Sequence, residues 1–164
     1  MNRILVTGNA GSGKTYLSQK IHSILDIPLY SMDSIVWKPY WKTASSSEIK
    51  NEIDKIISKK KWIVDGVSST IQKSADCVIF IDCTRRKSFF RVFKRNLPYL
   101  FRSRPGLPEN CLEIKIIPRL INIIWNFPKD VKPGILKKMN QESGQLNYHF
   151  KTREEVNTFL KQGY

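Results

Sequence analysis

Long apolar runs are absent from this sequence, and cysteine, histidine and acidic residues are scarce. No apolar stretch approaches the roughly eighteen residues that a membrane-spanning helix needs. The first residues lead directly into a strand-like segment, so we expect no secretory signal and predict a cytoplasmic protein. A chain of 164 residues suits a single domain, and the sequence contains no linker-like tract that would divide it.

Cysteine and histidine are too few and too scattered to predict a disulfide framework or a metal cluster. Cys77, Cys83 and Cys111 form no Cys-x-x-Cys pair. Cys77 and Cys83 fall in one expected strand, where their spacing of roughly 20 Å is about three times the reach of a disulfide. We expect these thiols to be small buried side chains. His22 and His149 lack partners at metal-binding spacing and are expected to be structural.

Acidic residues are outnumbered two to one by basic residues. The 14 Asp and Glu against 28 Lys and Arg give a formal net charge of +14 at pH 7. The excess is concentrated between residues 85 and 138, where 14 basic and 3 acidic side chains leave +11. Such a local excess favours a polyanionic partner, either nucleotide phosphates or nucleic acid. Composition leaves both alternatives open.

Short apolar segments alternate with segments of helical periodicity along the chain. The apolar, β-branched segments predict strands at residues 3–7, 29–32, 62–64, 77–81 and 146–150. Apolar residues at helical spacing predict helices at residues 14–25, 45–57, from 84, from 118 and from 152. Capping-box pairs mark two helix starts: Ser45 with Glu48, and Thr152 with Glu155. The alternation predicts an α/β fold with helices on both faces of a parallel sheet.

The turn between the first strand and the first helix fits the phosphate-binding pattern Gly-x-x-x-x-Gly-Lys-Ser/Thr completely. Its residues are Gly8, Asn9, Ala10, Gly11, Ser12, Gly13, Lys14 and Thr15. The glycines let the backbone turn tightly and point successive N–H groups at an anion, and the following helix adds its positive N-terminal end. Lys14 can reach the β- and γ-phosphates of a triphosphate, and the Thr15 hydroxyl can bind Mg²⁺. Because a strand precedes this motif and a helix follows it, the sequence predicts a P-loop that binds ATP or a related triphosphate.

A second carboxylate for the metal is expected at the end of a neighbouring strand, and two residues compete for this role. Asp65 closes the strand at 62–64 and is followed by Gly66, while Asp82 closes the more apolar strand at 77–81. Ligands bind at this edge of a parallel sheet. Either acid could instead accept hydrogen bonds from local backbone N–H groups. The pattern alone does not choose between them.

The order of several segments is familiar beyond the P-loop. These segments are Gly8 to Thr15, Leu29 to Asp33 followed by Trp37, Trp62 to Gly66, Phe80 to Asp82, an arginine-rich helix, and Trp125 to Pro128. Together they resemble the adenylate-kinase-like P-loop proteins of the DNA topology modulation (FlaR-related) family, over nearly the whole chain. The P-loop is specific to the superfamily, whereas the Asp33 to Pro39 and Trp125 to Pro128 segments point to the narrower family.

This resemblance implies a nucleoside-monophosphate-kinase-like architecture of three layers around five parallel strands. It implies one kinase-like domain with an acceptor-side region at about residues 33–60 and a mobile, arginine-bearing lid at about residues 91–128. It also implies that Asp65, with Thr15, lies near Mg²⁺. Asp33 is implied to face the acceptor, although a turn acid at this position can also cap the next segment.

Basic residues share one face of the expected helix that starts near residue 84. Lysines and arginines occupy that face and apolar residues the opposite one: Lys87, Arg91, Lys94 and Arg95 against Phe89, Phe93 and Leu97. A solvated surface is the ordinary explanation for the lysines. The resemblance implies that Arg91 and Arg95 contact phosphates, a role that suits a planar, always-charged guanidinium. Arg102 and Arg104 follow in the loop and are further lid candidates.

The acceptor site is the least determined part of the sequence. Trp37, Tyr40 and Trp41 crowd the segment after Asp33 and could either stack on a planar acceptor or pack the acceptor-side region. After Gly66 the chain departs from the family pattern, with a shorter stretch that contains no arginine.

The sequence therefore predicts an ATP- and Mg²⁺-dependent phosphotransferase that acts on a small acceptor such as a nucleotide or a small metabolite. The residues implied in catalysis are Lys14, Asp33, Asp65, Arg91 and Arg95. One alternative is an ATP-binding protein that associates with nucleic acid through the basic segment, although no helix-turn-helix or other DNA-binding motif is present. Another is a nucleotide switch that binds ATP without efficient transfer. No membrane partner is expected.

Overall fold

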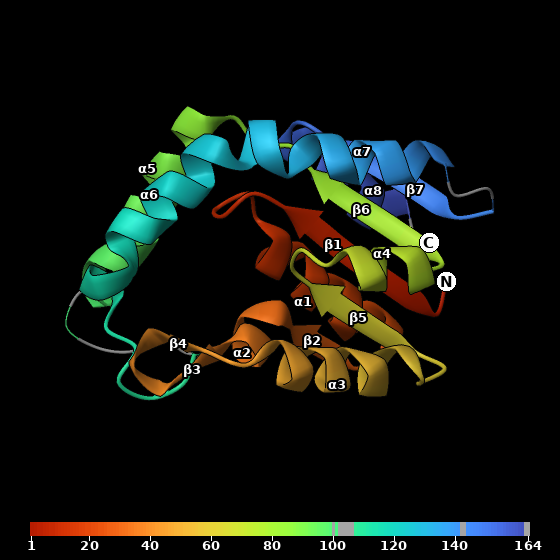
Figure 1. Ribbon diagram of the computed structural model, residues 1–164. Coiled ribbons are helices and arrows are strands. Elements are labelled where there is room, and N and C mark those ends of the chain that lie inside the picture. Colours follow the sequence, from red (N-terminus) through yellow and green to blue (C-terminus); the bar gives the residue numbers. More distant parts are fainter. Residues whose placement is uncertain (100, 102–106, 142–143, 163–164) are drawn as a thin grey trace.

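A parallel sheet of five strands forms the centre of the protein in the computed structural model, which describes residues 1–99, 101, 107–141 and 144–162 (Figure 1). The strands are β1 (Arg3–Gly8), β2 (Leu29–Ser31), β5 (Trp62–Asp65), β6 (Cys77–Ile81) and β7 (Leu146–Phe150). Their order across the sheet is β2-β5-β1-β6-β7, with every neighbouring pair parallel. The predicted α/β fold with a five-stranded parallel sheet is confirmed.

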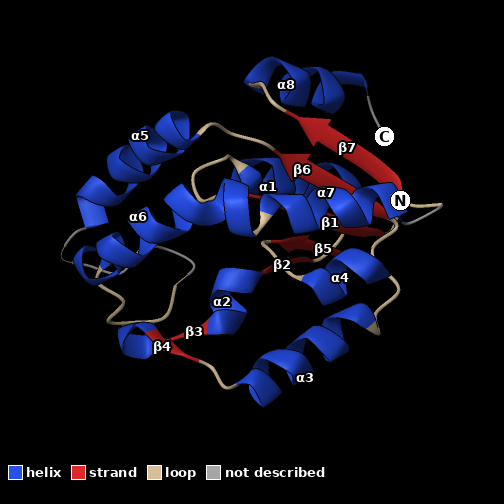
Figure 2. Ribbon diagram, turned by 45° about the horizontal axis from the view of Figure 1, so that its top comes forward, coloured by secondary structure: helices blue, strands red, loops and turns tan. Residues whose placement is uncertain are grey.

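Helices cover both faces of the sheet (Figure 2). One face carries α1 (Lys14–Leu25) and α8 (Arg153–Gln162), and the other carries α3 (Ser46–Ile57), α4 (Ser69–Ser74) and α7 (Lys132–Gln141). Alternate residues of β1 supply the two cores: Ile4 and Val6 pack on the first face, and Leu5 packs on the second. Because β1 is buried on both faces, its apolar run shows no polar alternation.

Both predicted capping boxes are present and fix where two helices begin. The Ser45 side chain accepts a hydrogen bond from the backbone N–H of Glu48, and the Glu48 carboxylate accepts one from the Ser45 backbone. Thr152 and Glu155 make the same reciprocal pair ahead of α8, at 3.1 and 3.3 Å. Each pair satisfies two N–H groups that a helix start would otherwise leave without partners.

Two helices project from the sheet as an arm that curves over the carboxyl ends of the strands (Figure 1). They are α5 (Arg85–Asn96) and α6 (Glu113–Asp130). The expected start of the second helix at Pro118 is wrong, because α6 begins at Glu113 and includes that proline. Burial of Ile116 and Ile124 contributes about 1.5–3 kcal/mol each, which offsets the roughly 3 kcal/mol cost of an interior proline. None of the described helices is long and apolar enough to cross a bilayer.

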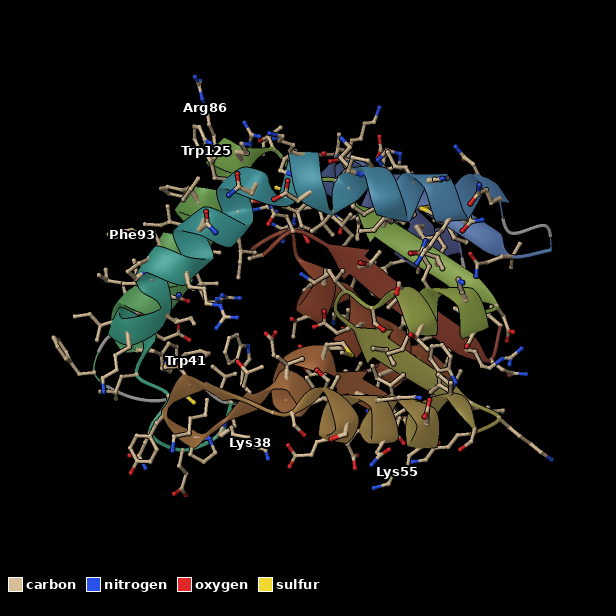
Figure 3. All side chains as sticks on the ribbon, in the orientation of Figure 1. Lys38, Trp41, Lys55, Arg86, Phe93 and Trp125 are labelled. Atoms are coloured by element: carbon tan, nitrogen blue, oxygen red, sulfur yellow. The ribbon has the colours of Figure 1, made fainter. Side chains whose placement is uncertain are left out.

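The aromatic face of α5 is not its buried face. Phe93 is 68% exposed on the outer side of the arm (Figure 3), whereas the buried residues of α5 are Ser88, Val92 and Asn96. The reason is a close approach to the P-loop: a Cβ added to Gly11 would lie 2.8 Å from both the Ser88 carbonyl oxygen and a Val92 methyl. Only small side chains on α5 allow this contact, so the larger aromatic residues face outward.

A small hairpin lies near the free end of the arm (Figure 1). After β2 the chain forms α2 (Met32–Val36), β3 (Trp37–Lys38), a 3₁₀ turn at Pro39–Trp41 and β4 (Lys42–Thr43). Trp41 Nε1 donates a 2.8 Å hydrogen bond to the Leu112 carbonyl just before α6, and Cys111 Sγ donates to the Lys38 carbonyl at 3.4 Å. These two hydrogen bonds join the hairpin to the segment just before the N-terminal end of α6.

Candidate functional site

The main candidate site is a cavity of about 470 Å³ at the carboxyl ends of the central strands, between the P-loop, the arm and the hairpin. Most of the predicted site residues line it: Gly8, Ala10, Gly11, Gly13, Lys14, Thr15, Asp33, Asp65, Arg91 and Arg95. The other two residues of the loop, Asn9 and Ser12, are buried, and Ser12 borders a second cavity. The structure therefore brings the predicted P-loop, strand-end acids and helix arginines to one place.

Internal hydrogen bonds hold the P-loop in a turned conformation. Asn9 is only 2% exposed, and its side chain accepts a bond from the Ala10 N–H at 2.8 Å and donates one to the Ile124 carbonyl at 3.1 Å. Lys14 Nζ donates to the Asn9 carbonyl at 2.9 Å. Gly13 begins α1 with a left-handed backbone, and the first turn of the helix contains no acid. The positive end of α1 is therefore directed at the cavity, as anion binding requires.

Thr15 and Asp65 supply two neighbouring oxygen atoms that can act as metal ligands beside Lys14. The Thr15 hydroxyl donates a 2.6 Å hydrogen bond to Asp65 Oδ2, and Asp65 is 7% exposed. In the described part of the chain, no group of three His, Cys, Asp or Glu side chains is placed to hold a metal ion. A hydroxyl and one carboxylate nevertheless fit Mg²⁺, which takes few protein ligands and completes its octahedron with water and phosphate oxygens.

Asp82, the competing acid, is engaged elsewhere. Lys132 Nζ donates to its carboxylate at 2.6 Å, and His149 Nε2 lies 3.0 Å from the same oxygen. Burial raises the pKa of the Asp82 carboxyl, but the hydrogen bonds from Lys132 and His149 outweigh it and hold the pKa below its ordinary value. The structure places Asp65, and not Asp82, against the P-loop threonine.

Asp33 and Asp65 reach the same cavity because their strands are neighbours. In the β2–β5 register Ser31 lies opposite Asp65, so each strand ends at the same level. Gly66 makes this close fit possible, since its φ is +147° and an added Cβ would lie 2.4 Å from the Met32 Cβ. Asp33, next to Met32, is exposed and lines the cavity. Glycine at position 66 is thus a packing requirement of this edge of the sheet.

The two predicted arginines lie one turn apart on the inner side of α5. Arg91 Nη1 donates to the Ser12 carbonyl at 3.2 Å, and both Arg91 and Arg95 line the cavity. Their spacing of four residues places both on one face of α5, and Arg95 Nε donates to the Asn96 side chain at 3.1 Å. Arg102 and Arg104, which the sequence also placed in the lid, lie outside the described residues.

Two tryptophans form the wall of the cavity that faces the P-loop across the opening. Trp37 and Trp41 meet edge to face with ring centroids 5.3 Å apart, and the Arg119 guanidinium lies 4.5 Å from the Trp37 ring centre. Trp41 has a left-handed backbone with φ of 58°. A bulky residue in this region costs roughly 1–3 kcal/mol and is characteristic of functional sites. Tyr40, the third aromatic residue of the segment, is 60% exposed.

Glu113 is a lining residue that sequence reasoning missed. It occupies the first turn of α6, is 1% exposed and borders the cavity. A buried carboxylate is unusual and is stabilised here in part by the positive end of its helix. In the sequence it is one acid in an apolar segment whose helix seemed to start later, so no local signal marked it.

A second cavity of about 450 Å³ lies beside the P-loop. It shares Gly13, Tyr16 and Arg91 with the first cavity. Lys151, between β7 and α8, and Arg153, the first residue of α8, complete it. The two cavities therefore border the same part of the P-loop. The contribution of the β7–α8 loop could not be predicted, since it depends on β7 lying beside β6.

Solved structures of kinases are similar to this chain along nearly its whole length. A shikimate kinase from Acinetobacter baumannii in complex with shikimate has a TM-score of 0.61 at 13% identity, over 99% of this chain and 92% of that one. A shikimate kinase from Bacteroides thetaiotaomicron gives 0.58 at 16%, over 98% and 95%. A sugar kinase from Janibacter sp. HTCC2649 gives 0.53 at 10%, over 99% and 91%. No protein-family model and no curated protein sequence matches the chain.

These similarities establish the class of fold. The chain has the P-loop kinase fold, with its five-stranded parallel sheet and a P-loop between β1 and α1. At such low identity the shared property is the architecture, which by itself assigns no substrate. Membership of the DNA topology modulation family stays a prediction.

Proposed function

We propose that this protein is an ATP-dependent phosphotransferase that transfers the γ-phosphoryl group to a hydroxyl of a small acceptor. The observation that carries the proposal is the 2.6 Å contact between Thr15 and Asp65 beside Lys14, with Asp33 lining the same cavity. Phosphoryl transfer needs this combination of an anion nest, a metal-binding pair and an acid for the incoming hydroxyl.

The P-loop side of the cavity binds and orients the triphosphate. Backbone N–H groups and the end of α1 hold the β- and γ-phosphates, and Lys14 turns from the Asn9 carbonyl to the phosphates. Arg91 and Arg95 reach over the γ-phosphate from α5 and stabilise the charge that spreads over its oxygens during transfer. Thr15 and Asp65 would hold Mg²⁺, which neutralises phosphate charge.

Asp33 acts on the acceptor side of the reaction. It accepts the hydrogen bond of the acceptor hydroxyl and orients that oxygen in line with the γ-phosphorus. The new oxygen–phosphorus bond forms as the bond from the γ-phosphorus to the β–γ bridging oxygen breaks. The proton of the hydroxyl passes to the Asp33 carboxylate, and ADP leaves with the electron pair of the broken bond.

The second cavity accommodates the nucleoside of ATP. It adjoins the P-loop through Gly13 and Tyr16, so the α-phosphate, ribose and base extend into it from a triphosphate bound at the P-loop. Arg91 borders both cavities and can contact phosphate and base in turn. The loop from Lys151 to Arg153 closes the far side of the base.

ADP production from ATP and Mg²⁺, measured with a panel of acceptors, tests this function. The panel holds nucleosides, nucleoside monophosphates, sugar acids, shikimate and duplex DNA. We expect one small acceptor to raise the rate strongly, and Lys14→Ala to lower that stimulated rate by about 10²–10³-fold because phosphate stabilisation is lost. Lys50→Ala, an exposed lysine of α3 outside the cavity, is the matched control and should retain the full rate.

Two results would contradict the proposal. Stimulation by DNA alone, with binding that falls steeply as salt rises, would instead assign the basic segment to nucleic acid. Tight ATP binding without stimulation by any acceptor would instead indicate a nucleotide switch.

A further inference from the structure

We infer that Asn9 of the P-loop and Pro128 of α6 form a positioning pair, which holds the arm in place over the phosphate site. The inference rests on the phosphotransferase function proposed above, because the arm carries Arg91 and Arg95. Pro128 deprives one backbone carbonyl of α6, that of Ile124, of its ordinary helical donor, and the Asn9 side chain supplies a donor instead. A hydrogen bond that would otherwise stay within the helix is thereby made with the P-loop.

The missing helical donor follows from the covalent structure of proline. In an α-helix the carbonyl of each residue accepts a hydrogen bond from the N–H of the fourth residue further along. For Ile124 that residue is Pro128, which lies inside α6 and has no N–H. Ile124 is 0% exposed, so its carbonyl needs a donor from within the protein.

Asn9 has the right chemistry and position to supply that donor. Its Nδ2 donates to the Ile124 carbonyl at 3.1 Å, while its Oδ1 accepts the Ala10 N–H at 2.8 Å. A side-chain amide can make both bonds at once, because one of its atoms donates and the other accepts. This single planar group therefore holds the backbone of the P-loop and the backbone of α6 in a fixed relation.

The bond lies where α6 passes from the body of the protein to the arm. Just beyond Ile124, Phe127 belongs to the core on one face of the sheet and stacks on Phe80 of β6, with ring centroids 6.5 Å apart. Helix α7, which follows α6, adds Ile135 and Met139 to the same core. The earlier turns of α6 project away from the sheet (Figure 1). A bond at this junction acts close to the point about which the arm would turn.

The two helices of the arm pack together, so a bond to α6 also positions α5. Val92 of α5 and Ile124 of α6 line one apolar groove between the helices. The Arg85 guanidinium of α5 lies 4.9 Å from the ring centre of Trp125 in α6. A displacement of α6 would therefore displace the two arginines of α5 that line the main cavity. Such groups stabilise the charge of a transition state best when they are already in place.

A double-mutant cycle on unfolding tests whether Asn9 and Pro128 act together. Asn9→Ala should raise the equilibrium constant for unfolding about ten- to a hundredfold, because the buried Ile124 carbonyl loses its donor. Pro128→Ala returns an N–H to the helix, so Asn9→Ala should have an effect at least about fivefold smaller in that background. Pro118→Ala is the matched control: Pro118 is an exposed proline of the same helix, and the residue four places before it, Ile114, is exposed. The full effect of Asn9→Ala should remain there.

The double variant separates a positioning role from a purely structural one. Asn9→Ala should lower kcat about ten- to a hundredfold while the Kd for ADP changes less than about threefold, because the arginines act on the transferred phosphoryl group. In Asn9→Ala with Pro128→Ala the helix satisfies its own carbonyl, so stability should return toward that of the wild type. Its kcat should stay low, since the bond to the P-loop is still absent. Recovery of both quantities would overturn the inference.

Hydrogen exchange of α6 gives a readout that requires no phosphoryl transfer. In the wild type and in Pro118→Ala, saturating ADP and Mg²⁺ should slow the exchange of amides in residues 113–124 at least about threefold, because the P-loop that binds ADP also holds α6. This slowing should be lost in Asn9→Ala and in the double variant, although ADP is bound. An effect of ADP on α6 that persists without Asn9 would contradict the positioning pair.

The positioning pair and the phosphotransferase function can fail separately. An equal effect of Asn9→Ala in the Pro128→Ala and Pro118→Ala backgrounds would refute the pair and leave the phosphotransferase function standing. Coupling in the cycle, together with an α6 that responds to ADP through Asn9 but no acceptor that raises the rate, would support the pair and refute the phosphotransferase function.

Discussion

The two walls of the main cavity are built in contrasting ways. The P-loop wall comes from eight consecutive residues, Gly8 to Thr15, which are held by hydrogen bonds among themselves and by bonds to Asp65, Arg91 and Ile124. The acceptor wall combines the hairpin around Trp41 with the first turns of α6, which are about seventy residues apart in the chain. A wall made from one segment keeps its chemistry wherever the fold occurs, whereas a wall made from distant segments is free to change with each substrate.

The largest effect on stability is expected where the P-loop wall meets α5. Gly11→Ala places a Cβ 2.8 Å from the Ser88 carbonyl and a Val92 methyl, at a φ of +71°. Because the obstacle includes backbone, the loop or α5 must shift, and we expect a loss of about 2–4 kcal/mol in unfolding free energy with ADP binding weakened at least tenfold. Thermal or urea unfolding and calorimetric titration of ADP measure both quantities.

Gly134→Ala is the matched control for this substitution. An added Cβ at Gly134 in α7 meets no atom within 4 Å, so the helix should become more stable by up to about 1 kcal/mol. Equal effects of the two substitutions would contradict the view that the P-loop wall depends on this close contact.

A smaller and more selective effect is expected on the acceptor wall. Trp41→Phe keeps an aromatic ring but removes the Nε1 donor to the Leu112 carbonyl. We expect a loss of about 1 kcal/mol in stability, and a several-fold rise in KM for the acceptor with ADP affinity unchanged, because only one wall is loosened. Steady-state kinetics with ATP and the acceptor varied in turn separates the effect on acceptor binding from the effect on nucleotide binding. Equal weakening of ADP and acceptor would show that the walls do not act independently.

The smallest effect distinguishes the two strand-end acids. Asp82→Asn removes a charge that Lys132 and His149 stabilise, so we expect a loss of about 1 kcal/mol at pH 7 and transfer activity within about threefold of wild type. The pKa of Asp82 is lowered in the folded state, so the ionised carboxylate stabilises the fold at neutral pH. This contribution is lost as the pH falls below about 4, the ordinary pKa of an aspartate. Unfolding curves of the two proteins should therefore converge in acid.

Asp65→Asn is the partner measurement for Asp82→Asn. It removes the charge of the carboxylate that pairs with Thr15, so the rate of phosphoryl transfer should fall about 10²-fold or more. The Mg²⁺ concentration needed for half-maximal activity should rise. A larger loss of activity in Asp82→Asn than in Asp65→Asn would reverse the assignment of the metal-side acid.

The sequence alone determined the parts of this protein whose physics is local. A Gly-x-x-x-x-Gly-Lys-Thr turn, apolar strands and capping boxes act within a few residues, so the P-loop, the five strands and the two capped helix starts could all be predicted. Even the strand-end acids were identified as candidates, because parallel strands must end at one edge of the sheet.

Only the tertiary structure decided which residues stand opposite the P-loop. Asp65 accepts the hydrogen bond of Thr15, while Lys132 of α7 and His149 of β7 bind the Asp82 carboxylate. Helix α6 continues through Pro118 because burial on the arm outweighs its local cost, and this carries Glu113 into the cavity. Contacts between distant segments leave no periodicity in the sequence, and they set the acceptor wall.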